Sequence, residues 1–204
     1  MGTCITTRPA SPASRLIRIA LCAFAVAIHS LPAAVASEVH ESSIYFEGRT
    51  YHYRFAVDVE APLEAVRAVV TDYDNLQRIN NDVVQSLVLE RYDEQRLKRR
   101  MWINHCLLVF CFDLYFVENV DLLDDGRIRT TIIPAESNFS HGQSVWRLEP
   151  LGETTTRISV EANQTPDFWI PPVIGPLVFK RAFVREVRET GRNIEREAQN
   201  AGAQ

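Results

Sequence analysis

Apolar and polar residues alternate with a period of two between residues 51 and 59, and this alternation predicts a half-buried strand. The larger apolar side chains of the segment stand at every second position: Tyr51, Tyr53, Phe55, Val57 and Val59. The period then changes. Pro62 suits the first turn of a helix, and apolar residues return after it at helical spacing, so a short helix is predicted over 62–71. The polar stretch 72–81 predicts a second short helix.

Only strand and turn signals follow between Val83 and Ala162. Further strands are predicted over residues 83–91, 95–106, 111–121, 127–134, 143–149 and 155–163. Asp124-Asp125-Gly126 and Pro150-Leu151-Gly152 supply turn residues between them. Together with the strand over 51–59, the pattern predicts an antiparallel sheet of about seven strands.

One long helix is predicted near the end of the sequence, after a segment rich in proline and aromatic residues. Gly175-Pro176 open it, and it is predicted to run to about Ala198. Its arginines fall largely away from one apolar face. That face carries Phe183, Val187, Ile194 and Ala198. The order of elements is typical of the α+β class, and the helix must lie across the sheet to bury its apolar stripe.

The first 36 residues have a different pattern. They hold three arginines and no acidic residue, then an apolar run over 19–28 and the segment Ala34-Val35-Ala36. A positive start, a short apolar run and a small-x-small site are typical of a secretory signal peptide, so cleavage after Ala36 is predicted. The run is shorter than the roughly 20 residues of a membrane-spanning helix. The mature chain is therefore expected to be residues 37–204, periplasmic or secreted in a bacterial envelope.

Loss of the signal peptide makes the chain more acidic. The full sequence has a formal net charge of −4, and removal of the three arginines lowers it to −7. A chain this acidic is a poor candidate for nucleic-acid binding. The length of 37–204 suits one domain with a hydrophobic core, and no further apolar stretch is long enough to cross a membrane. We expect a single domain that is soluble or peripheral to a membrane.

Four segments, taken in order, resemble a known family: VEAPLEAVRAVVTDYDNLQRIN at 59–80, SVWRLEP at 144–150, TTTRISVEA at 154–162 and PDFWIPPVIGP at 166–176. From about Arg49 to Ala198 the chain resembles the START-like superfamily of polyketide cyclases and coenzyme-Q-binding proteins, often called SRPBCC. This resemblance implies a helix-grip fold, in which a curved antiparallel sheet wraps around the terminal helix and encloses a cavity for a hydrophobic ligand. Members include lipid and sterol carriers, quinone-binding proteins and aromatase/cyclases, and the fold alone does not choose among them.

Residues 95–121 predict a hairpin of defined register. If its turn is centred between Leu108 and Val109, the apolar residues of both strands share one face, and a slip of one residue destroys the match. The register places these pairs opposite each other on that face: Met101 with Phe116, Ile103 with Leu114, and His105 with Phe112.

The same register places Cys106 opposite Cys111. Directly opposed residues lie roughly 4.5–5.5 Å apart at Cα, a span that a disulfide bond tolerates, and export permits the bond. A disulfide is the favoured interpretation, with two free core thiols as the alternative. A metal site using His105 is disfavoured, because zinc needs further ligands and the sequence places none nearby. We therefore expect no metal and no cofactor.

Arg99 and Glu118 also face each other in this register, on the otherwise apolar face. Three interpretations stay open. The charges are either a polar anchor for a ligand head group, or a gate at the cavity mouth, or they form an exposed ion pair near the sheet edge that contributes little. The exposed pair is the simpler interpretation.

A hydrophobic ligand is expected to lie between this face of the hairpin, nearby aromatic residues and the terminal helix. The residues expected to contact it are Met101, Ile103, Leu114, Phe116, Trp146, Phe168, Trp169, Phe183 and Val187. The hairpin tip is apolar where tips are normally polar. It consists of Leu107, Leu108, Val109 and Phe110. We expect it near the cavity entrance, with peripheral membrane contact, a protein partner, or packing against its own core as alternatives.

These observations favour a binding protein for a lipid or quinone over an enzyme. The sequence has no nucleophile elbow, phosphate loop or metal-binding histidine pair. One alternative is a cyclase-type enzyme acting on an aromatic or polyketide-like substrate, with Arg99, Glu118 or His105 as acid or base. Another is an envelope protein-interaction module that uses the hairpin tip.

Overall fold

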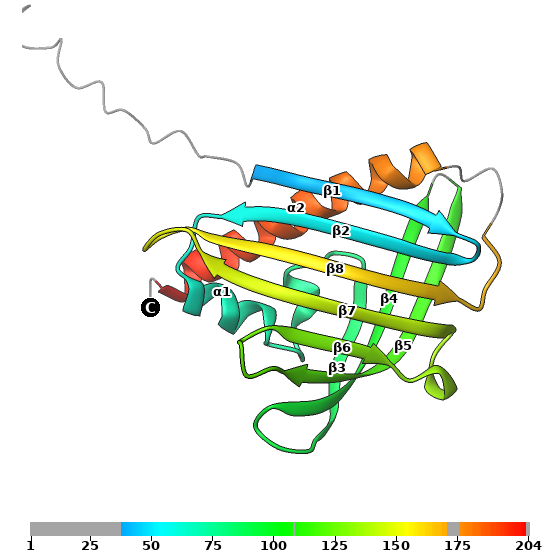
Figure 1. Ribbon diagram of the computed structural model, residues 1–204, viewed down its shortest axis with the longest axis horizontal. Coiled ribbons are helices and arrows are strands. Elements are labelled where there is room, and N and C mark those ends of the chain that lie inside the picture. The colour runs from blue at the N-terminus through cyan, green and yellow to red at the C-terminus, as the bar shows by residue number, and fades with distance from the viewer. Residues whose placement is uncertain (1–37, 108, 171–175, 203–204) are drawn as a thin grey trace, which may run out of the picture. The chain divides into compact units, whose positions relative to one another are not determined.

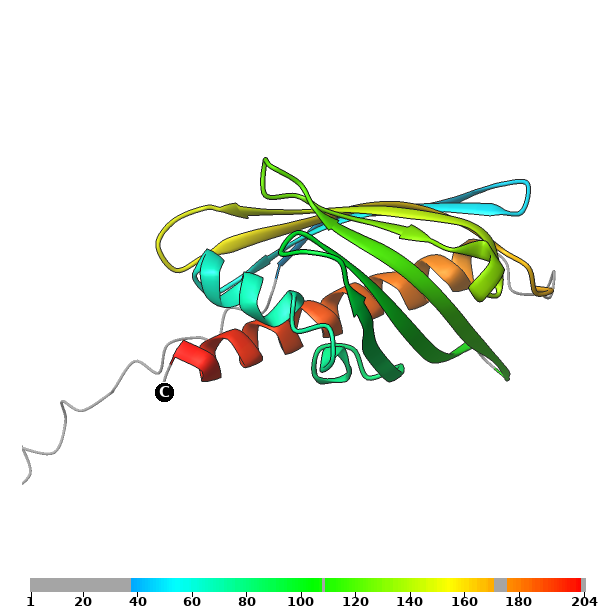
Figure 2. The ribbon, with the colours of Figure 1, turned by 90° about the horizontal axis from the view of Figure 1, so that it is seen from below.

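A curved antiparallel sheet and one long helix make up most of the structure, a computed structural model that describes residues 38–107, 109–170 and 176–202. In the sheet the strands follow the order β1-β2-β8-β7-β6-β5-β4-β3 (Figure 1). The sheet bends over helix α2, which crosses beneath it (Figure 2). The predicted α+β helix-grip architecture is confirmed.

The strands are β1 (Glu38–Glu47), β2 (Thr50–Val59), β3 (Val83–Arg91), β4 (Arg96–Leu107), β5 (Phe110–Leu122), β6 (Ile128–Ile132), β7 (Phe139–Pro150) and β8 (Thr156–Pro166). The helices are α1 (Leu63–Val70) and α2 (Pro176–Gly202), with the 3-10 turns η2 (Leu76–Arg78) and η3 (Pro134–Glu136). Between β5 and β6, Gly126 adopts a φ of +79°, which a glycine accepts without the steric cost of a side chain. The turn predicted at 124–126 is therefore present.

Strand β1 is absent from the sequence-based prediction, and it raises the number of strands in the described residues from about seven to eight. The first half of β1 is polar and contains a bulge between Val39 and Glu41, so it shows no alternation of apolar residues. As an edge strand it is only partly covered. Helix α2 holds its far end, where the rings of Phe46 and Phe179 pack edge to face with centroids 5.1 Å apart.

The second short helix predicted over 72–81 is wrong in extent, because only the turn η2 forms there. Side chains in this stretch bond locally instead. The Asn75 side-chain amide donates to the Asp72 carboxylate at 2.9 Å, and the Asp82 backbone N–H donates to Asn80 Oδ1 at 2.8 Å. Such bonds give the backbone an alternative to a helical ladder. Helix α1, by contrast, forms as predicted and buries Val66 and Val70.

The hydrophobic core lies between the sheet and the two helices. Pro176 is the first residue of α2, where the missing N–H of proline costs no hydrogen bond. Further along α2, the predicted apolar stripe is buried at Val187, Ile194 and Ala198 and belongs to the same core cluster as α1 and the strands. The helix therefore covers one face of the sheet, as its pattern predicts.

Strands β4 and β5 pair in the predicted register. Met101 lies opposite Phe116, and Ile103 lies opposite Leu114. Cys106 lies opposite Cys111, and a disulfide bond joins them. The register was predictable because the apolar residues of both strands and the two cysteines all require the same alignment.

The predicted signal peptide, with its cleavage site after Ala36, lies outside the described residues. Within the described part of the chain, no helix combines the length and the apolar character needed to span a membrane.

Candidate functional site

A cavity of about 350 Å³ lies between the inner face of the sheet and α2. Small-molecule sites in proteins fall in the range of about 300–1,000 Å³ and are mostly apolar with a few polar groups. This cavity has that character, because aromatic and aliphatic side chains from most strands and from α2 form its walls. The strands supply them because every second residue of a strand points to the same face.

Of the nine residues expected to contact a ligand, eight line this cavity. They are Met101, Ile103, Leu114, Phe116, Trp146, Phe168, Phe183 and Val187. Trp169 does not line it and is 71 % exposed. Its neighbour Phe168 packs against the rings of Phe112 and Phe139, with centroids 5.9 and 5.7 Å away. Phe168 and Ile170 both line the cavity, and Trp169 between them faces solvent.

The residues of the apolar hairpin tip differ in burial: one lines the cavity and another is exposed to solvent. Leu107 is buried and lines the cavity, where it packs with Ala182 of α2 and with Phe110. Val109 is 87 % exposed, and Leu108 lies outside the described residues. The packed alternative therefore holds for Leu107 but not for Val109.

Arg99 and Glu118 form a buried ion pair in the cavity wall. Arg99 Nε and Nη2 contact Glu118 Oε1 at 2.7 and 2.6 Å, and the guanidinium also lies 4.8 Å from the centre of the Tyr73 ring. The interpretation as an exposed pair near the sheet edge is wrong. Both residues are buried, and β3 extends the sheet beyond β4, so the pair lies neither at the sheet edge nor on the exposed surface.

Tyrosine hydroxyls add to the polar groups of the cavity. Burial raises the pKa of Tyr53, and the negative charge of Glu118 raises it further. The Tyr53 hydroxyl has no hydrogen-bond partner among the described residues, whereas the Tyr51 hydroxyl donates to the side chain of Gln164. Both tyrosines remain neutral donors at ordinary pH.

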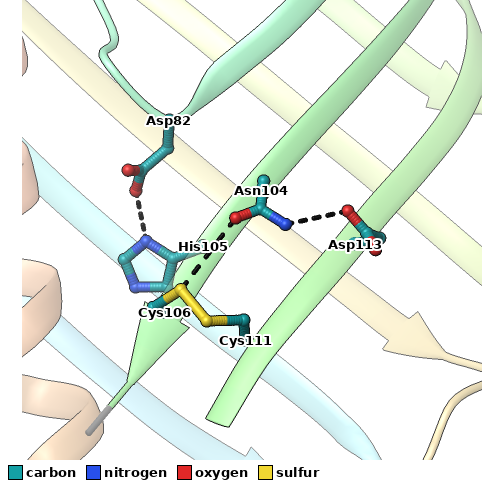
Figure 3. The surroundings of a disulfide bond; sticks show 6 residues. All are labelled: Asp82, Asn104, His105, Cys106, Cys111 and Asp113. Atoms are coloured by element: carbon teal, nitrogen blue, oxygen red, sulfur yellow. Dashed lines mark hydrogen bonds and ion pairs between the residues drawn. A yellow bond between two sulfur atoms is a disulfide. The ribbon is translucent and has the colours of Figure 1, made fainter. Parts of the chain in front are cut away.

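A second polar group of the cavity combines Asp82, His105 and Glu186. Their potential ligand atoms all lie within 4.8 Å of one another. His105 Nδ1 forms a hydrogen bond with the Asp82 carboxylate (Figure 3). Burial raises the pKa of Glu186, and the charge of Asp82 adds to this effect. Glu186 makes no hydrogen bond or ion pair with another described residue.

The opposite face of the same hairpin is held by the disulfide and by hydrogen bonds (Figure 3). The side-chain amide of Asn104 and the indole N–H of Trp102 donate to Asp113 Oδ1 at 2.9 and 3.0 Å. These bonds, the one from Asn104 first, hold the pKa of Asp113 below its usual value. The end of β4 is therefore fixed on one face while His105 points into the cavity from the other.

Sequence reasoning missed several cavity residues. Tyr51, Tyr53 and Phe55 line the cavity, and the alternation that places them on one side of β2 is the sequence signal for this position. Glu186 lies between Phe183 and Val187 on the apolar stripe of α2, a position where a carboxylate is unusual and which was a usable signal.

A family model described as polyketide cyclase / dehydrase and lipid transport matches residues 47–199. No curated protein matches the chain in sequence. The description of the family joins enzymes and carriers, so it does not choose between them.

Solved structures with this fold resemble the chain. An aromatase/cyclase from Streptomyces sp. R1128 is 15 % identical with a TM-score of 0.59, and the match covers 74 % of this chain and 94 % of that one. A STAR-related lipid transfer protein from Xanthomonas axonopodis is 14 % identical with a TM-score of 0.55, covering 75 % and 98 %. A START superfamily protein from Mycobacterium smegmatis is 18 % identical with a TM-score of 0.57, covering 74 % and 98 %. At these identities the likeness shows a shared fold alone.

Proposed function

The chain belongs to the polyketide cyclase/dehydrase and lipid transport family, and from this premise we propose that it is an exported protein that holds a hydrophobic small molecule of the lipid or quinone class. The cavity between the sheet and α2 is the single observation that carries the proposal. An unfilled apolar space of this size costs stability in a protein that does not use it, because the side chains around it lose packing partners.

Arg99 and Glu118 are the proposed anchor for the polar end of the ligand. Both contacts of Arg99 go to Glu118 Oε1, and no described residue donates a hydrogen bond to Oε2. A ligand hydroxyl can donate to that oxygen, and the Tyr53 hydroxyl can donate to a ligand carbonyl. A buried ion pair adds little net stability, so a role in recognising a head group accounts for its presence better than a role in folding.

Exposed apolar residues near the cavity supply a route for ligand entry. Val109 and Trp169 are exposed, while Leu107 and Phe168, close to them in the chain, line the cavity. We include peripheral membrane contact through the tip 107–110 in the proposal, because exposed apolar side chains such as Val109 can insert into the interfacial region of a bilayer. Flotation with vesicles should then be weakened by Val109→Asp and not by Val84→Asp, a change at another exposed valine.

Export is proposed from the pattern of residues 1–36, and the disulfide supports it because such bonds persist in oxidising compartments. The decisive experiment for binding is native mass spectrometry of protein purified from the periplasm, followed by extraction with organic solvent. An adduct that extraction releases as a lipid or quinone supports the proposal. Protein that is consistently empty, and that takes up no added lipid, contradicts it.

A second candidate is a cyclase-type enzyme for an aromatic or polyketide-like substrate. It is favoured by the convergence of Arg99, Glu118 and His105 on one cavity, with His105 oriented by Asp82 as a general base requires. Incubation with a short poly-β-ketone thioester should give a cyclised product that His105→Gln does not form. Unchanged substrate in the presence of folded protein removes this candidate.

A further inference from the structure

Asp82, His105 and Glu186 reach one point of the cavity wall from three different elements. Asp82 precedes β3, His105 is on β4, and Glu186 is on α2. Zinc binds imidazole nitrogen and carboxylate oxygen at about 2.0–2.2 Å in a tetrahedral arrangement, so two ligand atoms of one ion lie roughly 3.3–3.6 Å apart. The potential ligand atoms of this cluster all lie within 4.8 Å of one another, so no pair exceeds the tetrahedral separation by more than about 1.5 Å. The three side chains have to close by up to about 1.5 Å to share one ion, and if His105 coordinates through Nδ1, bonds to the metal replace its hydrogen bond to Asp82.

The contact between Asp82 and His105 alone does not account for the cluster. Histidine–carboxylate pairs are common in protein structures, and such a pair needs no third group. Glu186, however, places a second carboxylate beside the pair and has no hydrogen-bond or ion-pair partner of its own among the described residues. All three side chains are only partly buried and line the cavity. Two carboxylates beside one imidazole form a donor set that a divalent cation would complete.

The backbone holds the potential ligands in place. The Asp82 N–H donates to Asn80 Oδ1 at 2.8 Å, and its carbonyl accepts from the Asn104 N–H at 2.9 Å. His105 stands directly before Cys106, whose disulfide joins the ends of β4 and β5. Glu186 stands before the buried Val187 within a 27-residue helix. Ligands that are fixed before binding lose less conformational entropy when the ion enters.

We propose that Asp82, His105 and Glu186 bind a divalent transition-metal ion of the Zn²⁺ type, with a coordination position left open toward the cavity. Three protein ligands and one open position are the arrangement of metal sites that also bind water or a substrate. A carbonyl, hydroxyl or carboxylate of a molecule in the cavity can occupy that position. The site does not rest on the proposed lipid binding, because a protein that takes up no lipid can still bind Zn²⁺ here.

The test is titration of untagged, chelator-treated protein with Zn²⁺ by calorimetry, with Mg²⁺ for comparison. The wild type should bind one Zn²⁺ with micromolar or tighter affinity and bind Mg²⁺ far more weakly. Glu186→Gln keeps the shape of the side chain and should weaken Zn²⁺ binding tenfold or more, as should His105→Gln. Glu189→Gln is the matched control, since it removes the same charge from the same helix outside the cluster, and it should change the affinity less than threefold.

Two results overturn the proposal. One is a set of Zn²⁺ affinities that does not single out the cluster: Glu186→Gln binds as tightly as the wild type, or Glu189→Gln loses as much affinity as Glu186→Gln. Either outcome indicates diffuse attraction of Zn²⁺ to acidic residues. The other needs no variant. Co²⁺ bound by three side chains in a site of low coordination number absorbs visible light more strongly than Co²⁺ in buffer, so a spectrum that matches the buffer excludes the site. Thermal melts of each variant without metal show whether a loss of binding reflects unfolding.

Discussion

Arg99 and Glu118 face each other across β4 and β5 inside the protein, with side chains only 8 % and 3 % exposed and Arg99 Nη2 2.6 Å from Glu118 Oε1. Moving both charges out of water carries a large desolvation cost, which their attraction offsets only when the pair is intact. Removal of one partner therefore differs sharply from removal of both.

This relationship gives a prediction for stability. Arg99→Met leaves the Glu118 carboxylate buried without its partner and should lower the free energy of unfolding by about 3–5 kcal/mol. The double variant Arg99→Met/Glu118→Leu should recover most of that loss, since no buried charge remains. Urea unfolding of the two variants and the wild type measures both effects. If the double variant is also unable to retain the ligand found in the wild type, the pair acts as the anchor; unchanged binding contradicts that role.

The pairing of Arg99 with Glu118 could be predicted from the sequence, but the burial of the pair could not. The register that joins Arg99 to Glu118 followed from apolar residues that alternate in both strands, because only one alignment places them on a common face. Whether that face meets packed side chains or a cavity depends on how far α2 stands from the sheet. That distance is set by contacts such as Phe183 with Tyr53 and Phe55, which are distant in the sequence.

The Asp82–His105–Glu186 cluster was beyond prediction for a related reason. Each residue comes from a separate element, and no spacing along the chain connects them. Strand β1 was missed because its polar first half hides the alternation that identified β2. Local patterns thus predicted the paired elements, while the polar groups of the cavity depended on tertiary contacts.

A bulky side chain at Leu114 separates a cavity from a packed core. Leu114→Trp fills space in a true cavity, so it should abolish ligand retention with little change in melting temperature. In a packed core the same change costs about 1–3 kcal/mol. Leu87→Trp, on an exposed position of β3, is the matched control and should leave retention unchanged. A large fall in melting temperature for Leu114→Trp, with no lipid in either protein, means that this face is ordinary core.

Export should shorten the chain at its N-terminus. The charge pattern and the Ala34-Val35-Ala36 site predict that the mature protein begins at Ser37. Intact mass spectrometry of protein from the periplasmic fraction measures this directly. A species that retains the arginines of residues 8–18 in that fraction contradicts cleavage at Ala36.

The Cys106–Cys111 bond should be present in the isolated protein and contribute modestly to stability. Intact mass should increase by two hydrogens on reduction. The closed loop is short, so the chain-entropy model gives only about 2 kcal/mol of stabilisation. Replacement of both cysteines by serine should therefore lower the melting temperature without unfolding the protein. Alkylation of both thiols without reductant shows that the bond is absent.

Acid should weaken the contacts that Asp58 of β2 makes with Arg157 of β8 and with His40 of the edge strand β1. Arg157 donates two hydrogen bonds to this carboxylate, at 2.7 and 2.9 Å, and His40 contacts it at 2.6 Å. The Arg157 bonds, with the smaller effect of His40, hold the pKa of Asp58 below its ordinary value of 3.8. The folded state therefore binds this proton less readily than the unfolded state.

The stabilisation is complete above pH 3.8 and disappears as the pH falls through the lower pKa of the folded protein. Asp58→Asn removes the charge at every pH, so the variant should be less stable than the wild type at pH 7, and the difference should shrink as the pH falls below 3.8. Urea unfolding of both proteins across this range measures the difference. Asp124→Asn, a change of the same kind in the exposed turn between β5 and β6, should show no such convergence. A constant difference between Asp58→Asn and the wild type at all pH values would mean that the asparagine disturbs packing and that the ionised carboxylate does not stabilise β2 against β8.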